Sequence, residues 1–170
     1  VDGGRGFDAH PHNNMEIISY VIEGALEHKD SMGTGSVIKP GDVQHMSAGT
    51  GVVHSEFNHS PTEKVHFLQI WIVPKERDIE PKYNQKYFSE EDKLNKLAKI
   101  ISPDGSNSSI EINQDTTIFA SIVDKEGEVK FTPSNDNDYW IHVVQGNVNF
   151  QEYNLKEGDG VAITKGELSE

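Results

Sequence analysis

Short apolar runs that are rich in β-branched residues alternate with turn residues along most of the chain. β-branched side chains favour an extended backbone, and Gly, Pro and Asn end each run, so the runs predict strands. The predicted strands cover residues 17–22, 25–29, 36–38, 43–47, 52–57, 64–73, 117–123, 128–131, 140–144, 147–153 and 160–163. Strands that recur about every 8 to 12 residues, with no helix between them, indicate an all-β barrel or sandwich.

Three local expectations follow from the turn and capping residues. Glu23-Gly24 separates the first two predicted strands, so residues 17–22 and 25–29 should form a hairpin. Residues 74–81 are polar and bounded by Pro, which is typical of a linker. Ser89 is followed by acidic residues, which favours a helix that begins there and continues to Ile101.

The second half of the chain repeats features of the first half. Residues 20–24 resemble residues 142–146, and a Gly-Asp turn follows each segment, at Gly41-Asp42 and at Gly158-Asp159. Two copies of one β unit therefore account for the length of the chain. We expect an N-terminal barrel over residues 1–80, then a linker and a second barrel over residues 81–170.

Composition limits the chemistry that is available. The chain has no Cys, which excludes disulfides, zinc–thiolate sites and cysteine nucleophiles, so any metal must be held by His, Asp or Glu. The net charge of −13 argues against direct binding of nucleic acid, because phosphate binding needs a basic surface. No apolar run is long enough to span a membrane, and the missing cysteines favour a cytoplasmic location.

Two histidine-containing pairs have the spacing of metal ligands. His10 and His12 are two residues apart, and an extended chain places both side chains on one face. His54 and Glu56 repeat this spacing after a glycine-rich turn. On an antiparallel barrel the two pairs can converge on one metal ion, and three imidazoles with one carboxylate leave a position open for catalysis.

Other candidate residues have weaker patterns. Glu16 lies four residues after His12, and it could be a ligand, a hydrogen-bond partner of a ligand imidazole, or a solvated residue. The remaining histidines have no partner at metal spacing, and we expect a structural or surface role for each of them: His28, His45, His59, His66 and His142. The second unit should therefore bind no metal.

The ordered motifs resemble the pirin family of bicupins. Gly4, His10, His12 and Glu16 match the first cupin motif, and Pro40-Gly41-Asp42 followed by His54 resembles the second. The resemblance to pirins, and in particular to the bacterial pirin-like quercetin 2,3-dioxygenases, rests on residues 10–12, 20–24, 28–33, 40–44, 46–56 and 69–74, and weakly on 140–149.

The resemblance implies two cupin-type β-barrels, of which the first binds metal through His10, His12, His54 and Glu56. Glu16 would then lie next to the ligands without binding the metal. Position 45 is often bulky and apolar in the family, so His45 could alter the pocket. Pirin-like proteins extend beyond both ends, so we expect this chain to be a segment that lacks outer strands at each end.

The function implied is dioxygenase chemistry on a flavonol such as quercetin, which opens the central ring with O₂ and releases carbon monoxide. Fe(II) is the expected metal, and other first-row divalent ions are possible. Glu56 would accept the proton of the flavonol 3-hydroxyl, and Phe7, Met15, Ile18 and Met46 would form the apolar mouth. An alternative is a regulatory iron protein without turnover, whose metal acts as a redox switch for a protein partner. A third possibility is a metal-holding stress protein whose flavonol activity is incidental.

Overall fold

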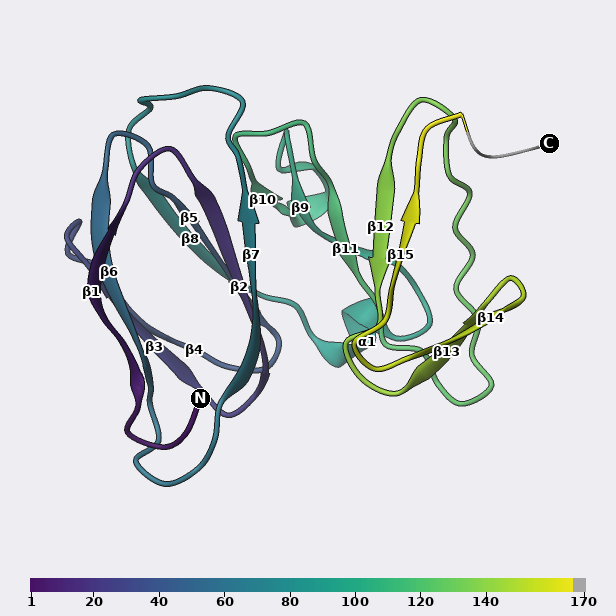
Figure 1. Ribbon diagram of the computed structural model, residues 1–170, viewed down its shortest axis with the longest axis horizontal. Helices are drawn as coiled ribbons and strands as arrows, with labels where there is room; N and C mark the ends of the chain where they lie inside the picture. Colours follow the sequence, from purple (N-terminus) through teal and green to yellow (C-terminus); the bar gives the residue numbers. More distant parts are fainter. Residues whose placement is uncertain (167–170) are drawn as a thin grey trace. The chain divides into compact units, whose positions relative to one another are not determined.

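The computed structural model describes residues 1–166 (Figure 1). The chain divides into two compact units, Val1–Val129 and Lys130–Glu170. Strands form nearly all of the regular structure in both units, which confirms the prediction of an all-β fold. No helix in the described part of the chain is long and apolar enough to cross a membrane.

The first unit contains two four-stranded sheets that pack face to face (Figure 1). One sheet has the order β1 (Gly6–His12), β6 (Val52–Asn58), β3 (Leu26–Asp30) and β4 (Gly35–Ile38). The other has the order β7 (His66–Ile72), β2 (Glu16–Glu23), β5 (Asp42–Ser47) and β8 (Lys82–Tyr87). A smaller sheet has the order β10 (Ile110–Glu111), β9 (Ala98–Ser102) and β11 (Ile118–Ala120).

Strand β2 is buried on both faces, and its successive side chains point alternately into two different hydrophobic cores. Ile17 clusters with Met46 and with Val52 of the opposite sheet, so this face of β2 lines the barrel interior. Ile18 points the other way and packs in a second core. The other buried members of that core are Val43, Phe88, Ile100, Ile101, Ile110 and Ile112. From Glu16 to Val21, residues of odd number thus face the interior, and residues of even number face the smaller sheet.

The predicted hairpin between residues 17–22 and 25–29 is wrong. β2 pairs with β5 and β7, whereas β3 pairs with β4 and β6 in the other sheet. Gly24 lies between β2 and β3 with a φ of +76°, and a Cβ there would lie 2.5 Å from the carbonyl oxygen of Lys64. This glycine therefore forms a corner at which the chain passes from one sheet to the other.

The predicted helix over residues 89–101 is confined to one turn. Ser89 caps α1 (Glu90–Lys93), and Leu94 is already extended. Ile100 and Ile101 are buried in β9, because their burial in the second core outweighs the helical start. The short 3₁₀ turn η1 (Ser106–Ser108) follows. Strand β8 was missed because its polar sequence has no apolar alternation, and no strand forms over residues 128–131.

The second unit is described over residues 130–166 and consists of two antiparallel pairs. β12 (Tyr139–His142) pairs with β15 (Gly160–Ile163), and β13 (Asn147–Phe150) pairs with β14 (Tyr153–Lys156). The predicted strands at 140–144 and 160–163 match β12 and β15 closely, whereas the single strand predicted over 147–153 is wrong, because a turn at Gln151 divides it between β13 and β14. The boundary between domains at residue 80 stays a prediction, although β8 beyond it pairs with β5 of the first unit.

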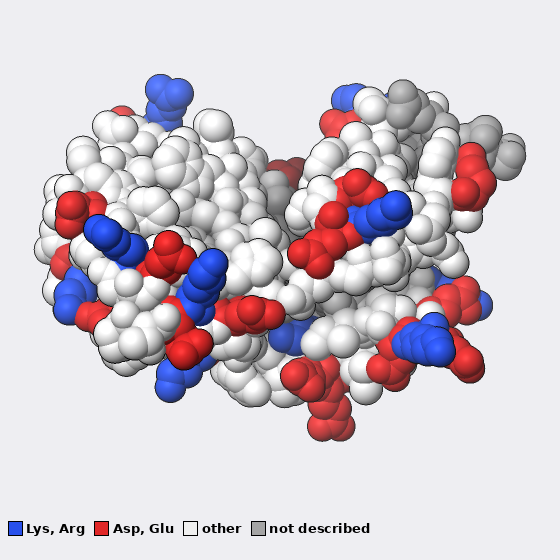
Figure 2. All heavy atoms as spheres, turned by 60° about the horizontal axis from the view of Figure 1, so that its bottom comes forward, with Lys and Arg blue, Asp and Glu red and all other residues white. Residues whose placement is uncertain are grey.

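The surface carries the negative charge that the sequence predicts. On the face shown in Figure 2, the Lys and Arg side chains stand singly or beside Asp and Glu rather than in one basic patch. The net charge of −13 thus has no local basic surface to offset it on that face. That the chain does not bind a phosphate backbone stays a prediction.

Candidate metal centre

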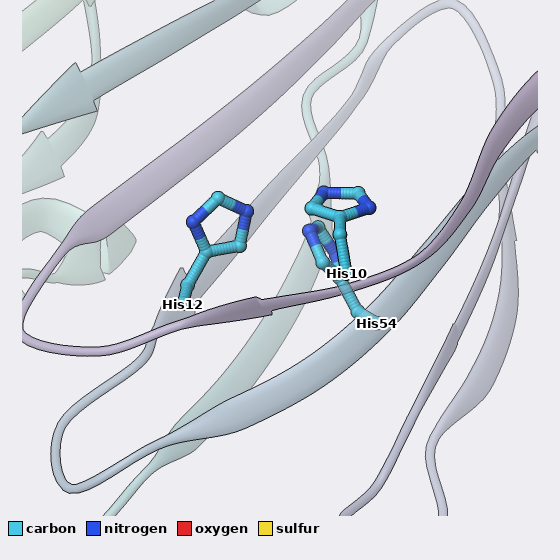
Figure 3. Close-up of side chains that lie close together, drawn as sticks. All are labelled: His10, His12 and His54. Carbon is cyan, nitrogen blue, oxygen red and sulfur yellow. The ribbon is translucent and has the colours of Figure 1, made fainter.

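Three imidazoles meet where β1 and β6 pair. His10 lies directly opposite His54 in the antiparallel register, and His12 follows two residues later on the same face of β1. The ring centroids are 4.5 Å apart for His10 and His54, and 4.9 Å apart for both His10–His12 and His12–His54. Figure 3 shows the three rings turned toward one another. One ligand atom from each lies within 4.8 Å of the others, which is close enough to share one metal ion.

The surroundings of His12 and His54 favour the neutral form that binds metal. Burial, followed by repulsion from His10, His28 and His12, lowers the pKa of His54 to about 3. Burial and the neighbouring His10 also lower the pKa of His12. The His10 Nδ1–H donates to the carbonyl oxygen of Asp8 at 2.7 Å, which leaves the Nε2 lone pair free to bind a metal.

One buried atom at the site has no partner in the protein. His54 is 2% exposed, and its Nε2 makes no hydrogen bond to any described residue. A buried polar atom without a partner is costly and calls for an explanation, such as a bound ion. Together with the three facing imidazoles, this atom shows that the residues fit a divalent transition metal ion.

Glu56 lies beside His54 but belongs to a group of possible ligands that does not include His10 or His12. Strand β6 alternates, so His54 and Glu56 share its buried face. Glu56 accepts a hydrogen bond from Gln69 Nε2 at 2.7 Å and a weaker one from Ser19 Oγ at 3.3 Å. One set of possible ligands consists of Glu56, His28 and His54, and the other consists of His10, His12 and His54. His54 is therefore common to both groups, and Glu56 as a fourth ligand stays a prediction.

His28 is a buried part of this cluster, although its sequence pattern predicted only a structural or surface role. It lies opposite Glu56 in the register of β3 and β6, and its ring centroid is 5.3 Å from that of His54. Its Nε2–H donates to Asp30 Oδ2 at 2.9 Å, and its Nδ1 is 3.1 Å from the Gln44 amide nitrogen. The alternation of Leu26, His28 and Asp30 is the signal that could have indicated an inward-facing side chain.

Glu16 does not lie with the three histidines, nor does it hydrogen-bond any of them. The chain turns between β1 and β2, where Asn14 has a φ of +48°, so the face of His12 does not continue to Glu16. Glu16 instead accepts hydrogen bonds from His45 Nε2 at 2.7 Å, Ser47 Oγ at 2.6 Å and the Asn113 backbone at 3.2 Å. The expectation that Glu16 lies next to the metal ligands is therefore wrong, because it points to the opposite side of the sheet.

Glu16 and His45 form part of a separate polar pocket. A cavity of about 230 Å³ borders both residues, and Asn113 and Lys82 also line it. Burial tends to raise the pKa of Glu16, but the hydrogen bonds from His45, Ser47 and Asn113 outweigh it and lower the pKa overall. His45 thus contributes to this outer pocket and not to the metal centre.

A larger cavity opens beside His12. It has a volume of about 460 Å³, and its walls include Met15, Val52 and Ser31. Of the four residues predicted at the mouth, Met15 lines this cavity and Phe7 is exposed. Ile18 and Met46 are buried in separate cores, so their predicted place at the mouth is wrong.

The remaining histidines lie outside both ligand groups. His59 bonds Glu27 at 3.0 Å, His66 is exposed at the start of β7, and His142 is exposed at the end of β12. Both ligand groups found in residues 1–166 belong to the first unit. That the second unit binds no metal stays a prediction.

Comparisons with known proteins identify relatives of this chain. The family model described as Pirin matches residues 1–72, and the model described as Quercetinase C-terminal cupin domain matches residues 99–169. The chain is 40% identical over 163 residues to a quercetin 2,3-dioxygenase of Escherichia coli strain K12, covering 96% of this chain and 69% of that protein.

Solved structures show the same fold. The bacterial pirin YhhW from Escherichia coli in complex with nickel(II) matches with a TM-score of 0.87 at 38% identity, over 98% of this chain and 71% of that chain. A quercetin 2,3-dioxygenase from Acinetobacter baumannii matches with a TM-score of 0.70 at 20% identity, over 98% of this chain and 58% of that one, which shows likeness of fold alone. The motifs, the all-β cupin fold and the relative that is 40% identical lead to one conclusion: the chain belongs to the pirin family.

Proposed function

We propose that this chain carries the metal centre of a quercetin 2,3-dioxygenase-type oxidoreductase, with His10, His12, His54 and Glu56 holding one divalent ion. The observation that carries the proposal is the convergence of three imidazoles, one of which, that of buried His54, has an Nε2 without a partner among the described residues. The Escherichia coli relative named quercetin 2,3-dioxygenase supports the substrate class, and the nickel(II) complex supports a divalent first-row ion. Fe(II) is the ion that we propose for this chain.

A divalent ion, when bound, lowers the pKa of a hydroxyl group that coordinates it. Glu56 would accept the proton of a flavonol 3-hydroxyl, while Gln69 and Ser19 donate hydrogen bonds to its carboxylate. The cavity of about 460 Å³ borders His12, and a flavonol would bind there beside the metal centre. The flavonol oxyanion that results is electron-rich, and its reaction with one O₂ opens the central ring and releases one carbon monoxide.

Oxygen consumption with quercetin tests this proposal directly. The full-length protein, loaded with Fe(II) or Ni(II), is expected to consume one O₂ and release one carbon monoxide for each quercetin lost. The measurement combines an oxygen electrode with carbon monoxide detection and needs confirmed metal occupancy. Absence of oxygen uptake by fully loaded protein would contradict the enzymatic proposal and favour the regulatory alternative.

Metal content provides an independent test of the site. We expect one divalent ion per chain, and His54→Ala should abolish tight binding because it removes the imidazole common to both ligand groups. His142→Ala is the matched control, since this exposed histidine lies in the second unit. Elemental analysis of the purified full-length variants measures both. Loss of metal in His142→Ala would show that the second unit binds metal, and two ions per chain would contradict a single site.

A further inference from the structure

A chain of hydrogen bonds connects Glu56 with the indole of Trp71 through one side chain. Gln69 donates from Nε2 to Glu56 Oε2 at 2.7 Å, and its Oε1 accepts from Trp71 Nε1 at 3.1 Å. Gln69 and Trp71 are two residues apart on β7, so both side chains point to the same side of the sheet. Ser19, which pairs with Gln69 in register on β2, donates to the other oxygen of Glu56.

The Trp71 contact determines which end of the Gln69 amide faces Glu56. An indole N–H only donates, so it requires the amide oxygen of Gln69 as its acceptor. The amide nitrogen must then point to Glu56, where it donates to a carboxylate oxygen. The reverse orientation would place the amide oxygen against the carboxylate, and two acceptors repel each other.

The two oxygens of Glu56 accept hydrogen bonds of different length. Oε2 accepts the short bond from Gln69, whereas Oε1 accepts only the longer bond of 3.3 Å from Ser19. Oε1 is therefore the oxygen with more capacity for a further partner, either a metal ion or a proton. Trp71 also packs edge to face against His12, with ring centroids 5.0 Å apart. Trp71 therefore contacts both a proposed ligand, His12, and the hydrogen-bond partner of Glu56, Gln69.

We propose that Gln69 is a positioning residue, oriented by Trp71, which holds Glu56 Oε2 and directs Oε1 toward the metal. This inference rests on the proposed role of Glu56 as a ligand. Carboxylates and imidazoles that bind metals are commonly oriented by such hydrogen bonds, and loss of one such partner typically costs about 10–100-fold in affinity or activity.

Metal affinity of the full-length protein tests the positioning role without relying on turnover. Ni(II) affinity is measured by competition with a chromophoric chelator, and the visible absorption of the Co(II)-loaded protein reports coordination geometry. Gln69→Leu is expected to weaken Ni(II) binding about tenfold and to change the Co(II) spectrum. Trp71→Phe keeps an aromatic ring but loses the N–H, and it should shift both readouts in the same direction by a smaller amount.

A matched control and a double-mutant cycle exclude a general structural effect. Gln114 also has both ends of its amide hydrogen-bonded, to Val73 and to Asp115, outside both ligand groups. Gln114→Leu should therefore leave Ni(II) affinity within about twofold of the wild type. In a Glu56→Gln background, Gln69→Leu should add less than about twofold, because no carboxylate remains to be positioned.

The outcomes separate this inference from the proposal on which it rests. If Glu56→Gln leaves Ni(II) affinity unchanged, Glu56 is not a ligand, and both ideas are overturned. If Glu56→Gln weakens binding but Gln69→Leu behaves like Gln114→Leu, only the positioning role is overturned. An undiminished effect of Gln69→Leu in the Glu56→Gln background would likewise show that Gln69 does not act through Glu56.

Discussion

Replacing Glu56 with Gln is expected to lower flavonol turnover per bound ion by about 10²–10⁴-fold, which is the usual contribution of a general base. The substitution keeps the size of the side chain and one acceptor oxygen, but it removes the charge and the basicity. Metal affinity should fall by a smaller factor than turnover, because the three imidazoles of His10, His12 and His54 remain. Turnover is measured as quercetin loss after each variant is loaded with metal to the wild-type level.

The comparison with a ligand variant gives this prediction its control. His54→Ala should lose metal and turnover together, since it removes a primary ligand, whereas Glu56→Gln should separate the two. Wild-type activity per ion in Glu56→Gln would show that Glu56 is not the base. In that case, its hydrogen bonds to Gln69 and Ser19 would have only a structural role.

Replacing Glu16 with Ala is expected to destabilise the fold by at least about 1–3 kcal/mol, the usual cost of leaving one buried hydrogen-bonding group without its partner. Glu16 is fully buried, and its removal leaves His45, Ser47 and the Asn113 N–H without their acceptor. Asn113 lies beyond β10, so the loss also weakens the attachment of this segment to the barrel. Urea unfolding measures the effect, with exposed Glu63→Ala as the control.

The dependence of this stability on pH follows from the lowered pKa of Glu16. Burial acts to raise the pKa, and the hydrogen bonds that lower it below the ordinary value of 4.5 prevail. A carboxylate whose pKa is lower in the folded state contributes stability above its unfolded pKa, and that stability is lost as the pH falls through the folded pKa. Glu16→Gln should lack this component. Equal acid sensitivity of Glu16→Gln and the wild type would contradict the assignment.

The alternation of apolar and polar residues was enough to predict the fold class. Period-two patterns and glycine turns are local, so strands such as β5 and β6 could be predicted from their own residues. The pairing of β2 could not, because the corner at Gly24 and a hairpin turn have similar sequences. The helix over residues 89–101 failed for a related reason: its capping residues are local, but burial of Ile100 and Ile101 depends on distant strands.

The candidate site shows the same division between local and tertiary information. The spacing of His10 with His12 and of His54 with Glu56 predicted which side chains share a face, because alternation along a strand needs no knowledge of the fold. The antiparallel register that sets His10 opposite His54 was decided by tertiary structure.

Tertiary structure also decided the places of Glu16 and His28. The change of direction before β2 moved Glu16 to the outer side of the sheet, and the pairing of β3 with β6 brought His28 beside Glu56. Sequence spacing determines the face of a strand on which a side chain lies. Only the pairing of strands determines what that face meets, because hydrogen bonds between strands join residues that are far apart along the chain.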